Sequence, residues 1–207
     1  MSGFHLILAS ESPRRKVLLT DLGIRLKIIS PKVAEVPQAQ ESPRLFSRRL
    51  AREKAETVAG IYPRHWVLGA DTVVVLADNI LGKPKGPAEA ASFLRLLSGR
   101  THTVITSFCL VKKDLGFSKT RSVASSVTFK FLTKEEIAWY VRTNEPLDKA
   151  GAYAIQGKGA FLVKRIKGSY ANVVGLPVSE VLEALEQYAG YKLGKAMQKS
   201  EIRSTFF

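Results

Sequence analysis

Strand-like and helix-like segments alternate along this chain of 207 residues, beginning near the N-terminus. Short apolar runs at residues 5–9 and 25–30 predict strands, and the longer run at residues 66–76 is the strongest strand prediction. Two Ser-Pro pairs, Ser12-Pro13 and Ser42-Pro43, predict helix starts, because serine suits the N-cap and proline the first helical position. Alternation of this kind is typical of an α/β protein.

The second half of the chain predicts two long strands, a capped helix and a further strand. The long β segments are residues 101–112 and 118–132, separated by a turn that contains glycine. Thr133 and Glu136 have the spacing of a capping box, which starts a helix. A glycine-rich stretch at 151–175 contains further strand. The predicted helices cover residues 13–22, 43–59, 87–97, 137–142 and 178–188.

These elements predict a two-lobed mixed sheet with flanking helices and a central cleft. The length is sufficient to bury a sizeable core. We expect one domain over residues 1–189, whereas residues 190–207 form a polar, basic C-terminal tail that is loosely held.

The strongly basic composition does not by itself indicate nucleic-acid binding. The net charge is 32 − 18 = +14, but the excess is spread as +6, +4 and +4 over residues 1–65, 66–140 and 141–207. No nucleic-acid-binding motif accompanies it, so we expect no specific nucleic acid as a partner. Apolar runs are too short to span a membrane, and the single cysteine, Cys109, excludes an internal disulfide. We therefore expect a cytoplasmic protein.

Residues 10–15 combine a strand-to-helix junction with two arginines. Amide groups at a helix N-terminus favour an anion, and Arg14 and Arg15 add charge-assisted contacts to phosphate. Ser10 lies at the start of the same junction. The alternative to a phosphate-binding site is a first helical turn that faces solvent and carries two arginines without a ligand.

Asp71 interrupts the apolar strand at 66–76. A carboxylate inside such a run has to be hydrogen-bonded, bound to metal or placed at the edge of a cleft. Lys83 follows twelve residues later and returns to the same place if the chain forms a hairpin. Lys54 lies within a predicted helix, where most lysines are solvated. Purely structural or solvated roles are the alternatives for all three residues.

Two further residues are weaker candidates on their own. Glu35 lies in a polar connecting segment. It is a candidate metal ligand, and the alternative is a charged loop residue without a functional role. Gln156 is flanked by small residues that permit close approach of a flat ligand; the alternative is an ordinary strand position. The three histidines are scattered without the spacing of metal ligands, and Cys109 lies in an apolar run typical of a core.

Several motifs in order resemble the Maf family of nucleotide pyrophosphatases, from about residue 6 to residue 186. They are LILASESPRR (6–15), LAREKA (50–55), GADTVV (69–74), LGKP (81–84), LSG (97–99), EPLDKAGAY (145–153) and VVGLP (173–177). The resemblance implies a fold related to the house-cleaning inosine triphosphate pyrophosphatases, a divalent metal and a homodimer. It also implies hydrolysis of a nucleoside triphosphate to its monophosphate and pyrophosphate.

Within the family, the segment at 152–157 followed by 168–170 is similar to the branch that acts on dTTP and UTP. The resemblance implies that Arg14, Thr72 and Gln156 set this specificity, with modified pyrimidine triphosphates as further substrates. The 7-methyl-GTP branch, which is the nearest alternative, carries an acidic residue near Gln156. The family often has an acidic pair where this chain has Ala34-Glu35, so metal affinity here is expected to be lower.

The residue types fit this chemistry. Four cationic side chains can offset the negative charge of a triphosphate, namely Arg14, Arg15, Lys54 and Lys83. Ser10 is a further candidate for binding phosphate. Mg²⁺ or Mn²⁺ is expected to bind few carboxylates together with phosphate oxygens, and Glu35 and Asp71 are the candidate ligands. Asp71 is our candidate for the base that orients the attacking water, and metal ligation is the alternative role for this residue. The alternative of another class is a non-catalytic protein that inhibits septum formation or binds nucleic acid.

Overall fold

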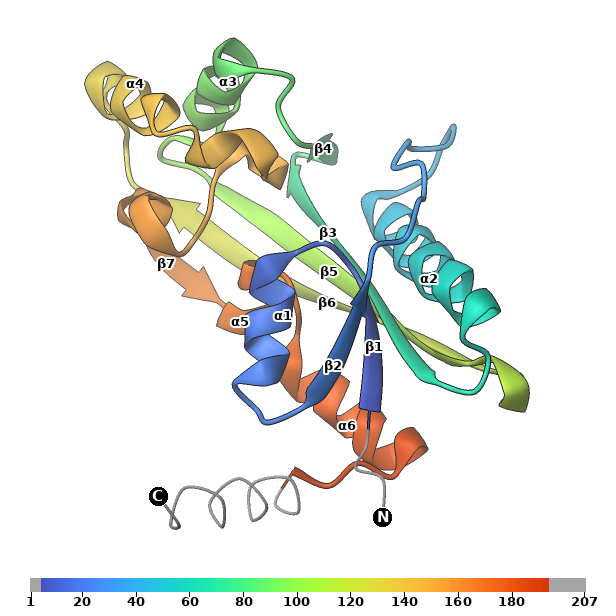
Figure 1. Cartoon of the computed structure of the whole chain (residues 1–207). Helices are drawn as coiled ribbons and strands as arrows, with labels where there is room; N and C mark the ends of the chain where they lie inside the picture. The colour runs from blue at the N-terminus through green and yellow to red at the C-terminus, as the bar shows by residue number, and fades with distance from the viewer. Residues whose placement is uncertain (1–4, 194–207) are drawn as a thin grey trace, which may run out of the picture.

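The computed structural model describes residues 5–193, in which seven strands form one mixed sheet with helices packed against it (Figure 1). The strand order is β2-β1-β3-β5-β6-β7, and β4 pairs with β3 off this path. The strands are β1 (His5–Ala9), β2 (Arg25–Ile29), β3 (Trp66–Leu76), β4 (Asn79–Leu81), β5 (Thr101–Lys112), β6 (Phe117–Phe129) and β7 (Val163–Lys167). The predicted mixed sheet with flanking helices is thus confirmed.

The helices alternate with the strands in the first half of the chain and gather in the second. The α-helices are α1 (Pro13–Thr20), α2 (Pro43–Ile61), α3 (Pro87–Leu97), α4 (Lys134–Arg142), α5 (Tyr170–Val174) and α6 (Val178–Ala189). Short 3₁₀ turns are η1 (Lys113–Leu115), η2 (Glu145–Asp148), η3 (Ala150–Ala152) and η4 (Gly157–Leu162). The chain between α4 and β7 is therefore a succession of tight turns.

The N-terminal strand ends beside the middle of a longer neighbour. β1 pairs in parallel with β2 and β3, whereas the other strand pairs are antiparallel. Its last residue, Ala9, lies opposite Gly69 in β3. β3 continues beyond this point through Asp71 and Thr72. The turn at residues 10–15 therefore starts next to the acid of β3.

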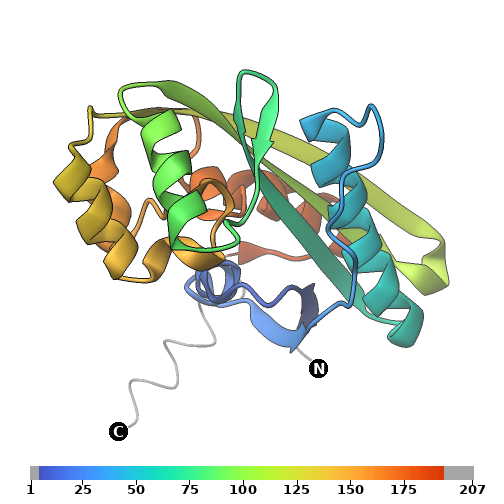
Figure 2. The same ribbon diagram turned by 90° about the horizontal axis from the view of Figure 1, so that it is seen from above.

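Alternate residues of the central strands face opposite layers. Leu6 and Leu8 of β1 pack with α1 and α6, while Ile7 and Ala9 pack against α2 on the other face. A separate cluster at the other end of the sheet includes Tyr140 of α4 and residues of α3. Figure 2 shows α3 and α4 gathered at one end and α2 at the other. These separate clusters correspond to the two expected lobes.

Helix α2 packs closely on β3 at Gly69. A Cβ atom added at Gly69 would lie 2.4 Å from the carbonyl oxygen of Ala51 and 2.6 Å from the backbone nitrogen of Ala55. Only a glycine permits this approach of helix and strand. Because Asp71 follows Gly69 on the same face of β3, and Lys54 lies between the two alanines, this contact brings an acid and a base together.

Most element bounds match the prediction, with local exceptions. The strand predicted at 118–132 ends at Phe129, because the chain then turns toward Ser98, whose hydroxyl accepts a hydrogen bond from the Leu132 amide. The last predicted strand is β7. The alternative of a strand position for Gln156 is wrong, since this residue precedes a 3₁₀ turn. Of the tail predicted at 190–207, residues 194–207 lie outside the described part of the chain.

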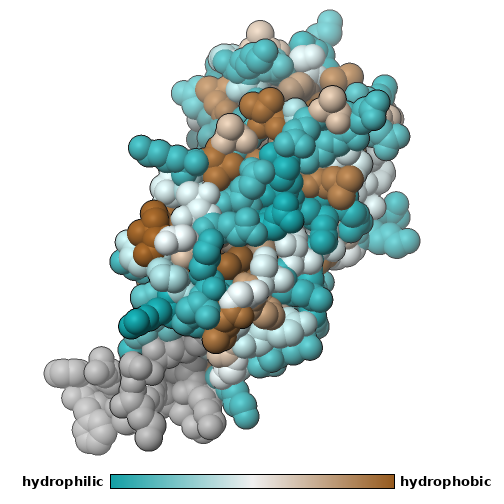
Figure 3. Space-filling model, turned by 90° about the vertical axis from the view of Figure 1, so that its right-hand side faces the viewer, coloured by the Kyte–Doolittle hydropathy of each residue, from teal (hydrophilic) through white to brown (hydrophobic). Residues whose placement is uncertain are grey.

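The face on the side of α2 is largely hydrophilic, with small apolar areas scattered among polar ones (Figure 3). Among the described residues, no helix combines the length and the apolar character that crossing a bilayer requires.

Candidate active site

All nine residues predicted as site residues line one pocket. Its cavity measures about 370 Å³. The nine residues are Ser10, Arg14, Arg15, Glu35, Lys54, Asp71, Thr72, Lys83 and Gln156. They come from the β1–α1 junction, the connection before α2, α2 itself, β3, the segment after β4 and the turn before η4. The fold therefore brings together segments that are far apart in the sequence.

Ser10 and Arg15 belong to an internal network of hydrogen bonds. The Arg15 side chain is buried, and its Nη1 donates to the Ser10 hydroxyl at 3.1 Å. Its Nε donates to the Gly175 carbonyl at 2.8 Å and its Nη2 to the Thr72 hydroxyl at 3.0 Å. Arg15 thus ties the first turn of α1 to β3 and to the segment after α5. Its charge still faces the pocket.

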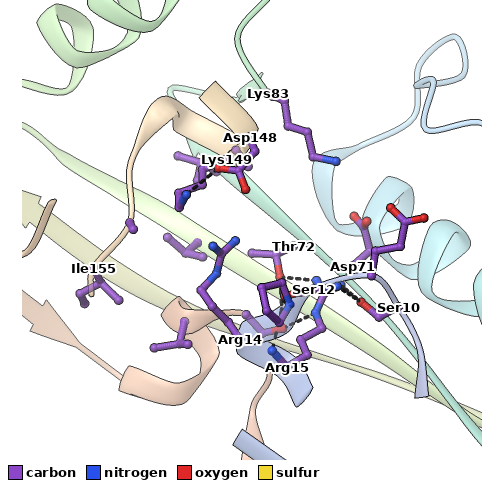
Figure 4. A pocket seen from close by; sticks show the side chains of 18 of the residues that line it. Ser10, Ser12, Arg14, Arg15, Asp71, Thr72, Lys83, Asp148, Lys149 and Ile155 are labelled. Atoms are coloured by element: carbon purple, nitrogen blue, oxygen red, sulfur yellow. Dashed lines mark hydrogen bonds and ion pairs between the residues drawn. The ribbon is translucent and has the colours of Figure 1, made fainter. Parts of the chain in front are cut away.

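The neighbouring arginine is differently placed. Within residues 5–193, the Arg14 guanidinium has no hydrogen-bond or ion-pair partner, so its donors are left for a ligand. Figure 4 shows Arg14, Lys83 and Lys149 reaching the pocket from three different segments. Lys83 is the most exposed of the predicted cations, with 62% of its side chain accessible. The helix start that holds both arginines is capped as predicted, since the Ser12 hydroxyl accepts from the Arg15 amide.

One lysine joins the two predicted carboxylates. The Lys54 ammonium lies 2.7 Å from Asp71 Oδ1 and 2.6 Å from Glu35 Oε1. Lys83 approaches the other oxygen of Glu35 at 3.6 Å. The Lys54 and Asp71 side chains are each only 9% exposed. A chain of alternating charges therefore crosses this wall of the pocket, and its buried end is the Asp71–Lys54 pair.

Burial and charge shift the titration of these groups in opposite directions. Burial raises the pKa of the Asp71 carboxyl, and the charges of Lys54 and Arg15 oppose that shift. Partial burial also works against ionisation of Glu35, but the hydrogen bond and charge of Lys54 outweigh it and lower the pKa of that carboxyl. A raised pKa makes Asp71 a stronger proton acceptor than an exposed aspartate. The two acids of the site are thus suited to different tasks.

The specificity candidates lie on different elements. The Thr72 hydroxyl, besides accepting from Arg15, is 2.9 Å from the Thr106 hydroxyl. Gln156 is exposed at the pocket, and within residues 5–193 its side-chain amide has no hydrogen-bond partner. Both ends of this amide are therefore available to a ligand.

Sequence reasoning assigned no individual role to several other residues of the pocket. Asp148, Lys149 and Tyr153 line it, and Gly175 supplies the carbonyl that accepts from Arg15. These residues lie in the motifs EPLDKAGAY and VVGLP. The motifs were visible, but nothing in their spacing indicated which members face the cavity.

The donor set is compatible with a divalent cation that arrives with phosphate. Within residues 5–193 no group of three or more His, Cys, Asp or Glu side chains is placed to hold a metal ion. Mg²⁺ commonly binds one or two carboxylates and completes its shell with water and substrate phosphates. Glu35 and Asp71, which already share the positive charge of Lys54, meet that requirement.

Comparisons with known proteins place the chain in a large set of relatives. Residues 5–188 match the family model of Maf-like proteins. A dTTP/UTP pyrophosphatase of Syntrophus aciditrophicus is 51% identical over 181 residues, which cover 87% of this chain and 88% of that protein. One of Myxococcus xanthus is 49% identical, with 88% and 91% covered. A solved structure of a nucleoside-triphosphatase, a dITP/XTP pyrophosphatase from Mycobacterium abscessus, matches with a TM-score of 0.47 at 13% identity, covering 90% and 96% of the two chains.

Proposed function

Since the chain belongs to the family of Maf-like proteins, we propose that it is a nucleoside triphosphate pyrophosphatase that hydrolyses dTTP and UTP to the monophosphate and pyrophosphate. Relatives that carry this name are 46–51% identical to it over most of their length. The observation that carries the proposal is the single pocket in which cations gather around the Asp71–Lys54 pair. The family resemblance supports a house-cleaning role for this activity.

The cations of the pocket bind the triphosphate. A triphosphate brings about four negative charges, and phosphoryl transfer depends on positioning and on neutralising its oxygens. Within the described residues, the Arg14 guanidinium has no protein partner, and Lys83 is well exposed. Arg15 contributes charge while its donors hold the pocket together. Together these groups fix the phosphate chain so that water can approach the α-phosphorus in line.

Asp71 acts on the attacking water. Its carboxylate is buried next to Lys54, and burial raises its pKa toward the range in which a carboxylate is an effective base. The water donates a hydrogen bond to the carboxylate and loses its proton there as it attacks. Lys54 orients the carboxylate through the contact at 2.7 Å.

We propose Mg²⁺ or Mn²⁺ as the cofactor, held by Glu35 together with phosphate oxygens; ligation by Asp71 is the alternative to its role as base, because a bound dication lowers the pKa of a carboxylate. These are hard oxygen ligands, which such cations prefer. When bound, the cation would supply further neutralisation of the phosphate charge. Because Lys54 contacts both carboxylates, it competes with the cation for them, and we expect weak metal binding in the absence of nucleotide.

The base is recognised by Gln156 with Thr72 and Arg14. A uracil or thymine edge presents an N3–H donor between carbonyl acceptors, so its partner has to accept and donate. A glutamine amide does both with one flat group, whereas a glutamate only accepts. The glutamine at 156 thus favours dTTP and UTP over the 7-methyl-GTP alternative.

Pyrophosphate release from a panel of nucleoside triphosphates tests the activity. The panel includes dTTP, UTP, CTP, the purine triphosphates and 7-methyl-GTP, each with and without Mg²⁺ or Mn²⁺. We expect dTTP and UTP to be hydrolysed best, and only with metal. No turnover of any of them, together with DNA or RNA binding that persists at moderate salt, would replace the enzyme with the non-catalytic alternative.

Substitution of Gln156 tests the selection of the base. Gln156→Glu should reduce the preference for UTP over CTP, measured as the ratio of kcat/KM, because a glutamate cannot donate a hydrogen bond to a carbonyl of the uracil edge. The matched control is Gln187→Glu on the exposed side of α6, where the glutamine side chain accepts a hydrogen bond from Arg121. An unchanged ratio in Gln156→Glu would remove this residue from the base site.

The family resemblance also supports a homodimer in the cytoplasm, with the nucleotide as the small-molecule partner. Light scattering during size-exclusion chromatography tests the oligomeric state, for which about 46 kDa is expected from a chain of 22.8 kDa.

A further inference from the structure

The turn that carries Gln156 is irregular and exposed, yet selection of a base requires this turn to keep one fixed conformation. Residues 155–158 lie outside regular strands and α-helices, and Gln156 itself is exposed. A displacement of about 1 Å is enough to weaken an oriented contact strongly. Something in the fold has to fix this turn before nucleotide binds.

A single carboxylate holds the far side of the turn. Glu145 Oε2 accepts from the Lys158 amide at 3.2 Å, and Oε1 accepts from the Gly159 amide at 2.9 Å. Gly157 has φ +68°, and a Cβ there would lie 3.0 Å from Glu145 Oε2. The carboxylate thus fits directly against the backbone that follows Gln156.

A buried tyrosine holds the near side. The hydroxyl of Tyr140, which is fully buried on α4, donates to Glu145 Oε1 at 2.9 Å and accepts from the Ala154 amide at 3.1 Å. A Cβ at Gly159 would lie 2.3 Å from the Ala154 carbonyl oxygen and 2.5 Å from the tyrosine hydroxyl. The two ends of the turn therefore touch each other and the same hydroxyl.

We propose that Glu145 and Tyr140 are positioning residues for base selection, because together they fix the turn at 154–159 so that the Gln156 amide meets the pyrimidine edge. This inference rests on the proposed function. Neither side chain is among those that line the pocket, so both act through the turn. They determine how well the site distinguishes uracil from cytosine, and the phosphate-binding residues on the other wall keep their geometry.

Two substitutions interrupt this arrangement at different points. Glu145→Gln retains the shape of the side chain but places an NH₂ group against backbone N–H donors. Tyr140→Phe removes only the hydroxyl, which leaves the Ala154 amide without its acceptor. The matched controls are Glu183→Gln on α6 and Tyr62→Phe at the end of α2, neither of which contacts the turn.

The decisive measurement is the affinity for UTP and CTP analogues whose α,β-bridging oxygen is replaced by methylene, determined by calorimetry. We expect both variants to lower the UTP/CTP affinity ratio about tenfold, while affinity for the CTP analogue changes less than about threefold. The controls should keep the wild-type ratio. Thermal melting establishes that each variant is folded. If Glu145→Gln does not fold, the affinity ratio of Tyr140→Phe by itself tests the proposal.

The outcomes separate this inference from the activity on which it rests. An unchanged affinity ratio in folded variants overturns the positioning role, and so does a wild-type protein with no preference for the uracil analogue. A uniform loss of affinity for both analogues also overturns it, because it indicates general damage to the pocket. If wild-type protein prefers the uracil analogue but releases no pyrophosphate from UTP, the proposed function fails while the positioning role is still decided by the variants.

Discussion

The two walls of the pocket are held in place by different forces. On one wall, Lys54 of α2 and Asp71 of β3 form an ion pair that extends to Glu35 in the connection before α2. On the other wall, Gln156 lies in a turn whose backbone amides donate hydrogen bonds to the side chains of Glu145 and Tyr140. Regular elements support the charged wall, whereas hydrogen bonds to backbone support the turn. In the proposed function the first wall carries the chemistry and the second the choice of base.

This difference predicts two kinds of mutational effect. Charges in a poorly solvated place interact strongly, so removing one changes its neighbours as well as itself. A turn held by hydrogen bonds moves when one acceptor is lost, and only contacts made by that turn suffer. Substitutions on the charged wall should therefore alter turnover and pH dependence. Substitutions around the turn should alter selectivity.

The largest effect is expected for Lys54→Met. Loss of one partner leaves Asp71 buried with an uncompensated charge, which costs about 3 kcal/mol of stability at neutral pH. Without Lys54, burial raises the folded-state pKa of Asp71 further above its unfolded value, so the penalty is absent at low pH and grows as pH rises through the folded-state value. In the wild type, the lowered pKa of Glu35 gives stability that is lost as pH falls. Both terms make the variant's deficit shrink between pH 7 and about pH 4.

Urea unfolding of both proteins at several pH values measures this deficit. The pH-independent control is Lys164→Met on the exposed edge strand β7. If the loss of unfolding free energy in Lys54→Met were constant with pH, the ion pairs of Lys54 would not contribute to stability. The proposed difference between the two walls would then be contradicted.

The next effect in size is expected for Asp71→Asn. The amide can still accept a hydrogen bond from Lys54, so the protein should fold and bind nucleotide. Turnover of UTP should fall about 100-fold or more, equivalent to about 2.7 kcal/mol, because the general base is lost. The UTP/CTP ratio should stay unchanged, since the turn is untouched.

Steady-state pyrophosphate release tests this variant beside Asp78→Asn, which makes the same change in the turn that follows β3. Turnover close to that of wild type in Asp71→Asn would contradict its catalytic assignment. A changed UTP/CTP ratio would instead show that the two walls are coupled.

A smaller effect is expected for Gly159→Ala. The added Cβ would overlap the Ala154 carbonyl and the Tyr140 hydroxyl, so the turn has to move, at a cost of about 2 kcal/mol. Selectivity for UTP should fall while turnover of CTP is retained. Gly60→Ala in α2 is the matched control, because a Cβ there meets nothing within 4 Å. It should raise stability by about 0.5–1 kcal/mol, and an equal loss in both variants would argue against a tight turn at 154–159.

The smallest effects are expected for Arg14→Ala and Lys83→Ala. Each removes one cation from a partly solvated position, so kcat/KM for UTP should fall about tenfold. Lys83→Ala should affect CTP to the same extent, whereas Arg14→Ala should also reduce the UTP/CTP ratio, because Arg14 is in addition one of the residues proposed to recognise the base. The loss should diminish as salt rises, because Lys83 is well exposed and its charge is screened. Kinetics at two ionic strengths test this, and wild-type values in both variants would refute the phosphate-binding role.

Local signals made the first wall largely predictable from the sequence. An acid in an apolar strand, Asp71, can be recognised wherever the strand is recognised, and the cap at Ser12 fixes where α1 begins. The sequence did not show that Lys54 is the ion-pair partner of Asp71, because the two residues meet only through the packing of α2 on Gly69. That contact depends on tertiary structure, which periodicity does not encode.

The turn that forms the second wall was less predictable for a physical reason. The stretch around Gln156 is rich in small residues and was compatible with a strand, but positive φ angles at Gly151 and Gly157 bend it into 3₁₀ turns. Glu145 accepts hydrogen bonds from backbone N–H groups, which every residue except proline has. No pattern of side chains therefore indicates its partners, although the surrounding motif had been identified.

The contact between Gly69 and α2 has a consequence for how such a sequence can diverge. A methyl group at position 69 would push α2 outward and take Lys54 away from Asp71. Larger side chains at Ala51 or Ala55 would have the same result from the helix side. We therefore expect these three positions to evolve as a unit, with a substitution at one tolerated only after compensation at another. A drift in residue size alone, without any change of charge, would then be sufficient to silence the site.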